Sequence, residues 1–352
     1  YVVALIQAAG TIVNMVVSIF LIYIGAGVLF VKAVATGVYM LRLVLVKIYV
    51  KRKYPALDFY AEPNEGALKQ KNAALLHQVV GIIVNNTDTT VLTICLGAKS
   101  LLEVSVYGIY MMVVNAVNQL MTSFSNGLTA GFGEVIAKNE EETLKKSYSS
   151  YEYMYFVIMF IVIACMGVLI LPFVGVYTIN LTDVQYVRPV LGILFTLIVF
   201  MQNVRIPGLT IICAAGHYKE TRYQAILEAV INITVSLGLV WKFGMAGVLL
   251  GTVCSYGYRS FEIVFYTSRH LVKGCAKKSM FRILRNVFTV AILCTVGTYV
   301  IPQEITSFTT WFLYAIGMGL TSVFFVVVIN YVVEPDEFMQ LRHRVNDIIK
   351  KE

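Results

Sequence analysis

The chain has 352 residues, of which 58% are hydrophobic and only 14% are charged, and its mean hydropathy is +0.76. A soluble globular domain carries charge on roughly a quarter of its residues, so this composition excludes a soluble fold and predicts an all-α membrane protein. The net charge of +8 does not indicate nucleic-acid binding, because the basic residues flank apolar segments and do not form a soluble basic face.

Ten segments are long and apolar enough to cross a bilayer as helices, each of which needs about 20 residues. Their length and uniform apolar character favour a polytopic bundle of transmembrane helices. The segments are 1–24, 28–48, 75–96, 104–128, 151–176, 190–214, 223–241, 245–266, 286–301 and 309–333.

Basic residues gather in every second loop between these segments. Short cytoplasmic loops are enriched in Lys and Arg, so we expect both ends of this chain on the cytoplasmic side of a cell membrane. The basic stretches are 47–71, 138–146, 219–222, 269–285 and 342–351.

Composition also divides the chain into parts. The polar stretch between the second and third segments contains Pro55, Pro63 and Gly66, which favours a linker between two bundles. The expected parts are two helices at 1–53, a cytoplasmic linker at 54–72, six helices at 73–268, a basic connector with two further helices at 269–335, and an amphipathic cytoplasmic tail at 336–352.

Several of the apolar segments carry a narrow polar stripe on one helical face. In 223–241 the stripe consists of Gln224, Glu228, Asn232 and Ser236, which are spaced four residues apart. Polar groups are unfavourable in hydrocarbon, so the stripes together predict a polar cavity shared by several helices. For any single Asn or Thr, the alternative is an interhelical hydrogen bond worth about 0.6–2 kcal/mol.

The stripes differ in strength along the chain. The segment 104–128 has the richest set of amides, whereas 156–176 and 312–333 are almost wholly apolar and are expected to be peripheral and to face lipid. The amide stripe consists of Asn115, Asn118, Gln119, Thr122 and Asn126.

The charges expected within or at the edge of the segments lean basic. Arg205 is followed by Pro207, which removes a backbone donor and can kink or open a helix. A guanidinium there suits a phosphate, because its planar fork of donors matches phosphate oxygens. Alternatively, Arg205 neutralises Asp88 or Glu228. The whole set is Arg42, Arg188, Arg205, Arg259 and Lys32, against Asp88, Glu228 and Glu262.

The sequence allows two roles for the acids Asp88 and Glu228. Intramembrane carboxylates often serve proton relays, so they could bind a proton or a sodium ion that drives transport. They could also balance the charge of an arginine. Arg259 and Glu262 are three residues apart and are expected to pair with each other.

No motif of an enzyme is present in the sequence. The chain has no P-loop, no HExxH pair and no nucleophile elbow. Its six cysteines show no paired spacing and its four histidines no ligand spacing, which predicts no disulfide framework, no metal site and no bound cofactor. We therefore expect a protein that is not an enzyme.

Several short motifs follow one another in a recognisable order. Residues 85–97 read Asn-Asn-Thr-Asp-Thr-Thr-Val-Leu-Thr-Ile-Cys-Leu-Gly and precede Val-Tyr-Gly at 106–108. Residues 216–222 read Gly-His-Tyr-Lys-Glu-Thr-Arg, and they precede a helix with a central Asn232 and a Gly-x-x-Gly stretch within 243–252. With this order and spacing, the chain resembles polysaccharide flippases of the Wzx type, within the multidrug/oligosaccharidyl-lipid/polysaccharide exporter superfamily.

The resemblance implies a MATE-like fold with two lobes around a central cavity. Residues 1–53 would be the last two helices of the N-terminal lobe, 73–268 the six-helix C-terminal lobe, and 269–335 would contain two extra C-terminal helices. About four N-terminal helices of that fold would then be absent from this chain.

The resemblance also implies a substrate, an undecaprenyl-diphosphate-linked oligosaccharide that is moved to the outer leaflet by alternating access. Arg205 and Arg42 would bind the diphosphate, and Asp88 and Glu228 would serve ion coupling, with H⁺ or Na⁺, or charge balance. The other expected partners are membrane lipids and polysaccharide polymerase machinery. The sugar hydroxyls would be bound by Asn115, Asn118, Gln119, Asn126 and Asn232.

Three other functions remain open. A multidrug or cation antiporter of the same superfamily would need an acid-dominated cavity, whereas the charges here lean basic. A lipid II flippase would differ mainly in its substrate. A membrane-embedded glycosyltransferase would need a large external loop or a cluster of catalytic acids, and the expected outward loops are short.

Overall fold

The computed structural model of the chain describes residues 2–55, 70–125, 128–302 and 305–339. All regular elements in these ranges are helices, and no strand occurs among them. The helices are α1 (Val2–Tyr23), α2 (Val28–Lys53), α3 (Lys71–Cys95), the short 3₁₀ helix η1 (Gly97–Lys99), α4 (Ser100–Ser125), α5 (Leu128–Ala137), α6 (Glu141–Tyr177), α7 (Pro189–Val204), α8 (Ile206–Ala214), α9 (Arg222–Phe243), α10 (Met245–His270), α11 (Ala276–Val300) and α12 (Phe308–Val333).

Eight helices or helix pairs in the described part of the chain are long and apolar enough to cross a membrane. The protein is therefore a multi-pass membrane protein. Ten such segments were expected from the sequence. Two of them, 75–96 and 245–266, form α3 and α10, which are long enough but not among the eight because polar and charged side chains interrupt their apolar runs. The eight spans are Leu5–Tyr23, Val28–Lys53, Gly97–Ala137, Glu141–Tyr177, Pro189–Ala214, Arg222–Phe243, Ala276–Val300 and Phe308–Val333.

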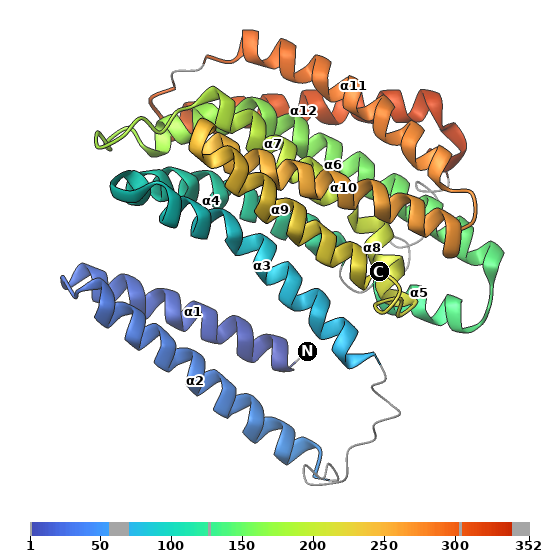
Figure 1. Cartoon of the computed structure of the whole chain (residues 1–352), viewed down its shortest axis with the longest axis horizontal. Helices are drawn as coiled ribbons and strands as arrows, with labels where there is room; N and C mark the ends of the chain where they lie inside the picture. Colours follow the sequence, from blue (N-terminus) through green and yellow to red (C-terminus); the bar gives the residue numbers. More distant parts are fainter. Residues whose placement is uncertain (1, 56–69, 126–127, 303–304, 340–352) are drawn as a thin grey trace. The chain divides into compact units, whose positions relative to one another are not determined.

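The chain divides into two compact units, Tyr1–Leu68 and Lys69–Glu352, which we call unit 1 and unit 2. Unit 1 is a hairpin of α1 and α2 (Figure 1). Its helices meet closely at Gly10, where an added Cβ would lie 3.1 Å from Cδ of Arg42. The guanidinium of Arg42 lies 5.1 Å from the centre of the Tyr39 ring.

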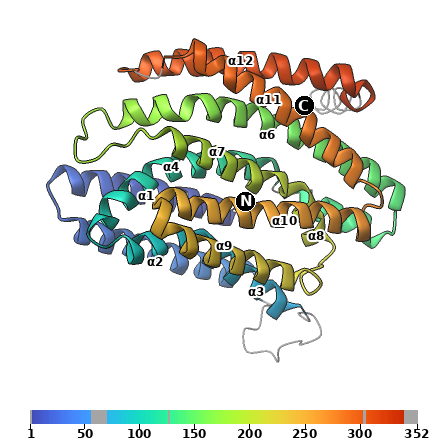
Figure 2. The same ribbon diagram turned by 45° about the horizontal axis from the view of Figure 1, so that its top comes forward.

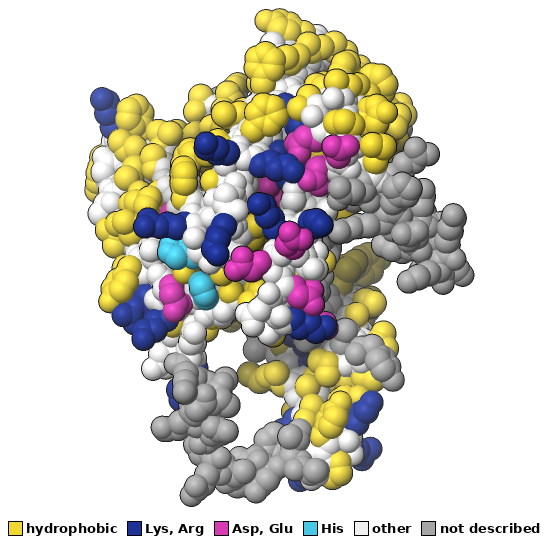
Figure 3. Space-filling model, turned by 90° about the vertical axis from the view of Figure 1, so that its right-hand side faces the viewer, with side chains coloured by type: hydrophobic (Ala, Val, Ile, Leu, Met, Phe, Trp, Pro, Cys, Tyr) yellow, Lys and Arg dark blue, Asp and Glu magenta, His cyan; other side chains and the backbone are white. Residues whose placement is uncertain are grey.

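Unit 2 contains α3 to α12, and its successive long helices alternate in direction (Figure 1). Figure 3 looks onto the end of unit 2 where α6, α9 and α11 begin, and charged side chains and histidines gather there. The exposed ion pair between Lys273 and Glu141 belongs to this end. Charged side chains thus gather at this end of helices that are apolar along most of their length.

The long helix α6 lies at the centre of unit 2, so the expectation that 156–176 faces lipid is wrong. In its most apolar window 56% of the residues are buried, against 17% in α12. Both α11 and α12 lie along α6 (Figure 1, Figure 2). An all-apolar helix suits the interior of a bundle as well as lipid, because both surroundings are apolar. α12 exposes most of its side chains, as expected for a peripheral helix.

Helices α9 and α10 approach each other so closely that one position admits only glycine. A Cβ added at Gly251 would lie 2.2 Å from Oγ of Ser236 and 2.7 Å from its backbone nitrogen. Beside this contact, Nδ2 of Asn232 donates to Oγ1 of Thr252 at 3.0 Å and to Oγ of Ser255 at 3.3 Å. Small residues and buried polar contacts of this kind hold membrane helices together.

A second polar contact joins α6, α11 and the residues after α12, and we call Glu152, Arg282, Arg285, Glu334 and Glu337 the anchor cluster. Arg282 is 1% exposed and donates to Glu152 at 3.1 Å and to Glu334 at 2.8 Å. Arg285 also donates to Glu334, at 2.9 Å. Burial alone raises the pKa of Glu337, but hydrogen bonds from Lys278 and Ser149 outweigh it and hold that pKa below its ordinary value. The anchor cluster fixes the last two helices to the centre of unit 2.

The contact at Gly251 yields a test of the α9–α10 packing. We expect Gly251→Ala to destabilise the protein by about 1–3 kcal/mol, because the methyl group overlaps Ser236. Gly257→Ala in the same helix is the control, since nothing lies within 4 Å of its added Cβ, and it should be neutral or stabilise by up to about 1 kcal/mol. Thermal unfolding of the detergent-solubilised protein measures both. Equal melting temperatures would contradict the close approach.

The anchor cluster yields a second test. Arg282→Ala leaves Glu152 buried without its cation, so we expect a loss of about 3–5 kcal/mol. Lys273→Ala removes one partner of an exposed pair and should change stability by no more than about 1 kcal/mol. The same unfolding measurement applies, and a small effect of Arg282→Ala would show that the cluster does not hold α11 in place.

Candidate functional site

A polar cavity of about 270 Å³ lies inside unit 2. Its walls come from α3, from the junction of α7 and α8, from α9 and from α10. The polar and charged residues that line it are His77, Gln78, Asn85, Gln202, Arg205, Tyr218, Thr221, Glu228, Tyr256 and Arg259. Four of the expected transmembrane segments, 75–96, 190–214, 223–241 and 245–266, therefore contribute to one cavity.

Arg205 reaches this cavity from the break between α7 and α8. Pro207 stands in the first turn of α8 and has no backbone N–H to continue the α7 ladder. At the break, the N–H of Arg205 bonds to the carbonyl of Asn203, and the carbonyl of Met201 accepts a hydrogen bond from Oγ of Ser260 in α10, at 2.6 Å. The kink expected from Pro207 is thus present, and α10 supplies a donor to the last turn of α7.

The charged groups of the cavity form a continuous row of alternating sign. Arg205 donates to Glu228 on α9, and its guanidinium lies 4.5 Å from the centre of the Tyr256 ring. Glu228 also lies 3.6 Å from Nε of Arg259, which pairs in turn with Glu262. The expected pair of Arg259 and Glu262 is confirmed. Two arginines and two glutamates make this row, which we call the ion row, neutral when all four are ionised.

Asp88 lies outside the ion row. It is 4% exposed and accepts hydrogen bonds from Oγ1 of Thr252 at 2.7 Å and from the Tyr107 hydroxyl at 3.2 Å. In the described ranges no ion pair reaches it, and Arg205 pairs with Glu228 in its place. Of the two acids that could have neutralised Arg205, the structure selects Glu228 and leaves Asp88 as a buried carboxylate with neutral donors.

A network of amides connects the cavity wall to α4. Asn118 donates to Gln202 at 2.8 Å, and Asn203 donates to Asn118 at 2.9 Å. The Tyr155 hydroxyl of α6 donates to Asn203 at 2.8 Å. Among the expected sugar-binding residues that the structure describes, only Asn118 joins this network. Gln202 and Asn203 were not expected at the site, although both lie within three residues of Arg205 in the kinked stretch.

The other expected site residues lie elsewhere. Asn115 and Gln119 are exposed on α4, and Asn126 falls outside the described residues. Asn232 is fully buried between α9 and α10, where its amide nitrogen is used by Thr252 and Ser255. Its position makes it part of the helix contact and not of the cavity surface.

The two other arginines expected at the site, Arg42 and Arg188, are not among the described residues that line the cavity within unit 2. Arg42 belongs to unit 1, in the α1–α2 hairpin. Arg188 forms a two-point contact with Glu103, with distances of 2.8 and 3.0 Å. It is therefore engaged in an ion pair between the start of α7 and α4.

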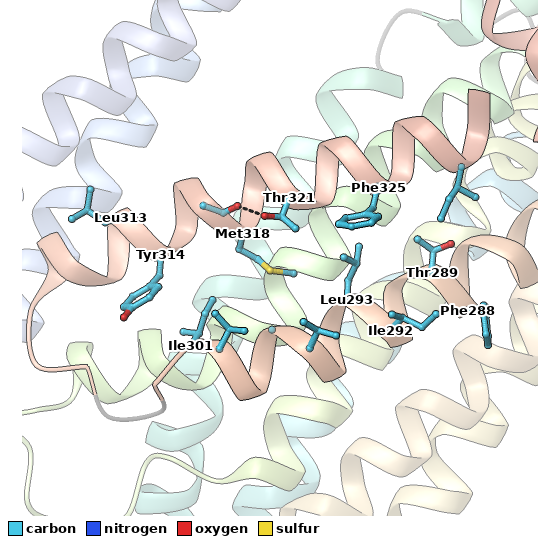
Figure 4. A pocket seen from close by; sticks show the side chains of 15 residues that line it. Phe288, Thr289, Ile292, Leu293, Ile301, Leu313, Tyr314, Met318, Thr321 and Phe325 are labelled. Carbon is cyan, nitrogen blue, oxygen red and sulfur yellow. Dashed lines mark hydrogen bonds between the residues drawn. The ribbon is translucent and has the colours of Figure 1, made fainter. Parts of the chain in front are cut away.

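A larger apolar groove of about 680 Å³ runs between α11 and α12. Leu293, Met318 and Phe325 line it, and none of the described residues that line it is charged (Figure 4). The hydroxyl of Thr321 bonds to the carbonyl of Gly317 within α12 at 2.8 Å (Figure 4). The groove can accept apolar chains but offers no chemistry for recognising a head group. Across the described ranges, no group of three His, Cys, Asp or Glu residues is placed to hold a metal ion.

The surroundings of Asp88 give a testable expectation. Asp88→Asn keeps an acceptor for Thr252 and removes a buried charge that has no cation, so the melting temperature should stay the same or rise. Asp88→Ala leaves two buried hydroxyls without their acceptor and should destabilise by about 1–3 kcal/mol for each. Thermal unfolding compares the two variants. Equal destabilisation by both would show that the fold requires the charge itself.

Comparisons with known proteins give no family for this chain. No protein-family model matches it, and no curated protein matches it.

Proposed function

We propose that the protein is a transporter that flips polyprenyl-diphosphate-linked oligosaccharide across the cell membrane, as the resemblance to Wzx-type flippases implies. The observation that carries the proposal is the guanidinium of Arg205, which lines a polar cavity inside a bundle of apolar helices. Charged groups inside a membrane protein are unfavourable unless function or pairing requires them. An arginine on a cavity wall suits a phosphate, because the planar guanidinium offers several N–H donors and the phosphate offers several acceptor oxygens.

The cavity is large enough for only one part of the proposed substrate. About 270 Å³ is at or below the lower limit of ordinary small-molecule pockets, so it has room for a diphosphate but not for an oligosaccharide. The sugars would extend past the mouth of the cavity along exposed amides such as Asn85, Asn115 and Gln119. The polyprenyl chain would remain in an apolar environment.

Transport would proceed by alternating access in a MATE-like arrangement of two lobes. In this proposal unit 1 is the end of the N-terminal lobe, with Arg42 as a second contact for the diphosphate, and α3 to α10 form the C-terminal lobe. The break between α7 and α8 is the expected point of bending, because discontinuous helices surround many transporter sites. The charged end shown in Figure 3 would face the cytoplasm, following the distribution of basic residues.

Asp88 supports a second candidate function within the same superfamily. A buried carboxylate without a described cationic partner is the type of group that binds H⁺ or Na⁺ in transporters. In a flippase this site would couple transport to an ion gradient. In a multidrug or cation antiporter it would be part of the substrate site, and Arg205 would then have a structural role only. A lipid II flippase differs from the first proposal only in its glycan.

The proposal is tested by the leaflet distribution of lipid-linked oligosaccharide in cells that express Arg205 variants. We expect Arg205→Ala to reduce transport at least about tenfold while the protein remains folded, because a lost charge-assisted contact is worth about 1.5–3 kcal/mol. Arg205→Lys should recover part of the activity, since it keeps the charge without the fork.

Arg269→Ala serves as the control, because Arg269 is an exposed arginine outside the cavity, and transport should be unchanged. Normal transport by Arg205→Ala would make Arg205 a structural residue. If deletion of the gene leaves the leaflet distribution unchanged, the flippase proposal fails altogether.

A further inference from the structure

The cavity already contains a carboxylate at the position where a phosphate would bind. Glu228 accepts a hydrogen bond from Nη1 of Arg205, and both residues line the cavity wall. A carboxylate and a phosphate use the same donors of a guanidinium. A phosphate that binds Arg205 must therefore compete with Glu228 or share Arg205 with it.

Sharing is unfavourable in this environment. Glu228 is 6% exposed, so a phosphate on the same guanidinium would place two anions side by side with little water to screen them. The other charged and titratable residues described on the cavity wall are His77 on α3, Cys213 on α8, Tyr218 between α8 and α9, and Tyr256 and Arg259 on α10. Only the two arginines carry a fixed positive charge that can compensate an added anion.

The structure also provides a second position for the Glu228 carboxylate. One oxygen contacts Arg205, and the other lies 3.6 Å from Nε of Arg259. A small rotation of the Glu228 side chain toward Arg259 would release Arg205 and keep Glu228 paired. Neither Asp88 nor Glu262 can take this part, because the structure pairs neither of them with Arg205.

We infer that Glu228 is a built-in competitor for the anion site: the phosphate of the ligand binds Arg205 by displacing Glu228, which then pairs with Arg259 alone. The inference rests on the proposed function, in that it takes Arg205 as the phosphate contact. It gives Glu228 a defined role at that site. The carboxylate keeps Arg205 neutralised while the cavity is empty and lowers its affinity for any anion.

A competitor and a purely structural partner predict opposite effects of removing the carboxylate. If Glu228 competes, Glu228→Gln frees Arg205 and tightens anion binding. If Glu228 only holds Arg205 in position, the same change loosens Arg205 and weakens binding. Inorganic pyrophosphate is the probe, because it carries the diphosphate group without the lipid or the sugar.

The experiment measures pyrophosphate affinity of the purified full chain by calorimetry. We expect Glu228→Gln to lower Kd about tenfold or more, and adding Arg205→Ala to that variant to abolish the gain. Glu134→Gln is the matched control, since it removes an exposed carboxylate by the same substitution, and its Kd should equal that of the unsubstituted chain. An unchanged or raised Kd for Glu228→Gln overturns the inference.

A second measurement needs no substitution and decides the question if Glu228→Gln does not fold. Dicyclohexylcarbodiimide modifies carboxyl groups in apolar surroundings, and mass spectrometry locates the product. Pyrophosphate should raise the modification of Glu228, because displacement leaves its carboxylate with one arginine partner in place of two. Unchanged or lower modification overturns the inference.

The two proposals fail in different ways. Equal pyrophosphate affinity in the unsubstituted chain and in Arg205→Ala removes Arg205 as an anion site and overturns both. Binding that depends on Arg205, without tightening in Glu228→Gln, leaves the anion site of the proposed function in place and overturns the competition alone.

Discussion

The structure of unit 2 depends on the requirement that charges within the bundle be compensated by their neighbours, through an opposite charge or, at Asp88, through neutral hydrogen-bond donors. Water is scarce there, and an isolated ion is strongly disfavoured. Arg205, Glu228, Arg259 and Glu262 meet this requirement as a row, and Arg282 meets it through Glu152 and Glu334. The row joins the α7–α8 junction to α9 and α10, and Arg282 joins α11 to α6 and to the residues after α12. Compensation of charge therefore also contributes to which helices pack together.

The two sets of charges differ in their surroundings, and this difference separates structure from function. The anchor cluster is buried between α6, α11 and the residues after α12, and none of its residues lines the polar cavity. Three residues of the ion row, Arg205, Glu228 and Arg259, line that cavity. Ion pairs of similar composition can thus hold helices together in one place and present charge to a ligand in another.

Much of the fold could be predicted from the sequence, because hydropathy and helical spacing are local properties. The helical class, the apolar spans and the pair of Arg259 and Glu262 follow from spacing alone. The central position of α6 could not be predicted, because the sequence of an apolar helix is the same whether its neighbours are lipids or other helices. A polar stripe in the sequence also does not determine whether its residues face a cavity or another helix. Asn232 and Glu228 belong to the same stripe, but Asn232 lies in the contact between α9 and α10 and Glu228 lies on the cavity wall.

The hydrogen bond from Ser260 to the carbonyl of Met201 limits how the α7–α8 break can behave as a joint. Straightening or bending α7 away from α10 would leave that carbonyl without a donor in an apolar interior, which is unfavourable by about 1–3 kcal/mol. The joint therefore favours discrete positions over continuous flexing. Ser260 directly follows Arg259. A shift of α10 that changes the contact between Arg259 and Glu228 therefore also changes the hydrogen bond from Ser260 to Met201, so the ion row and the α7–α8 break are linked through one turn of α10.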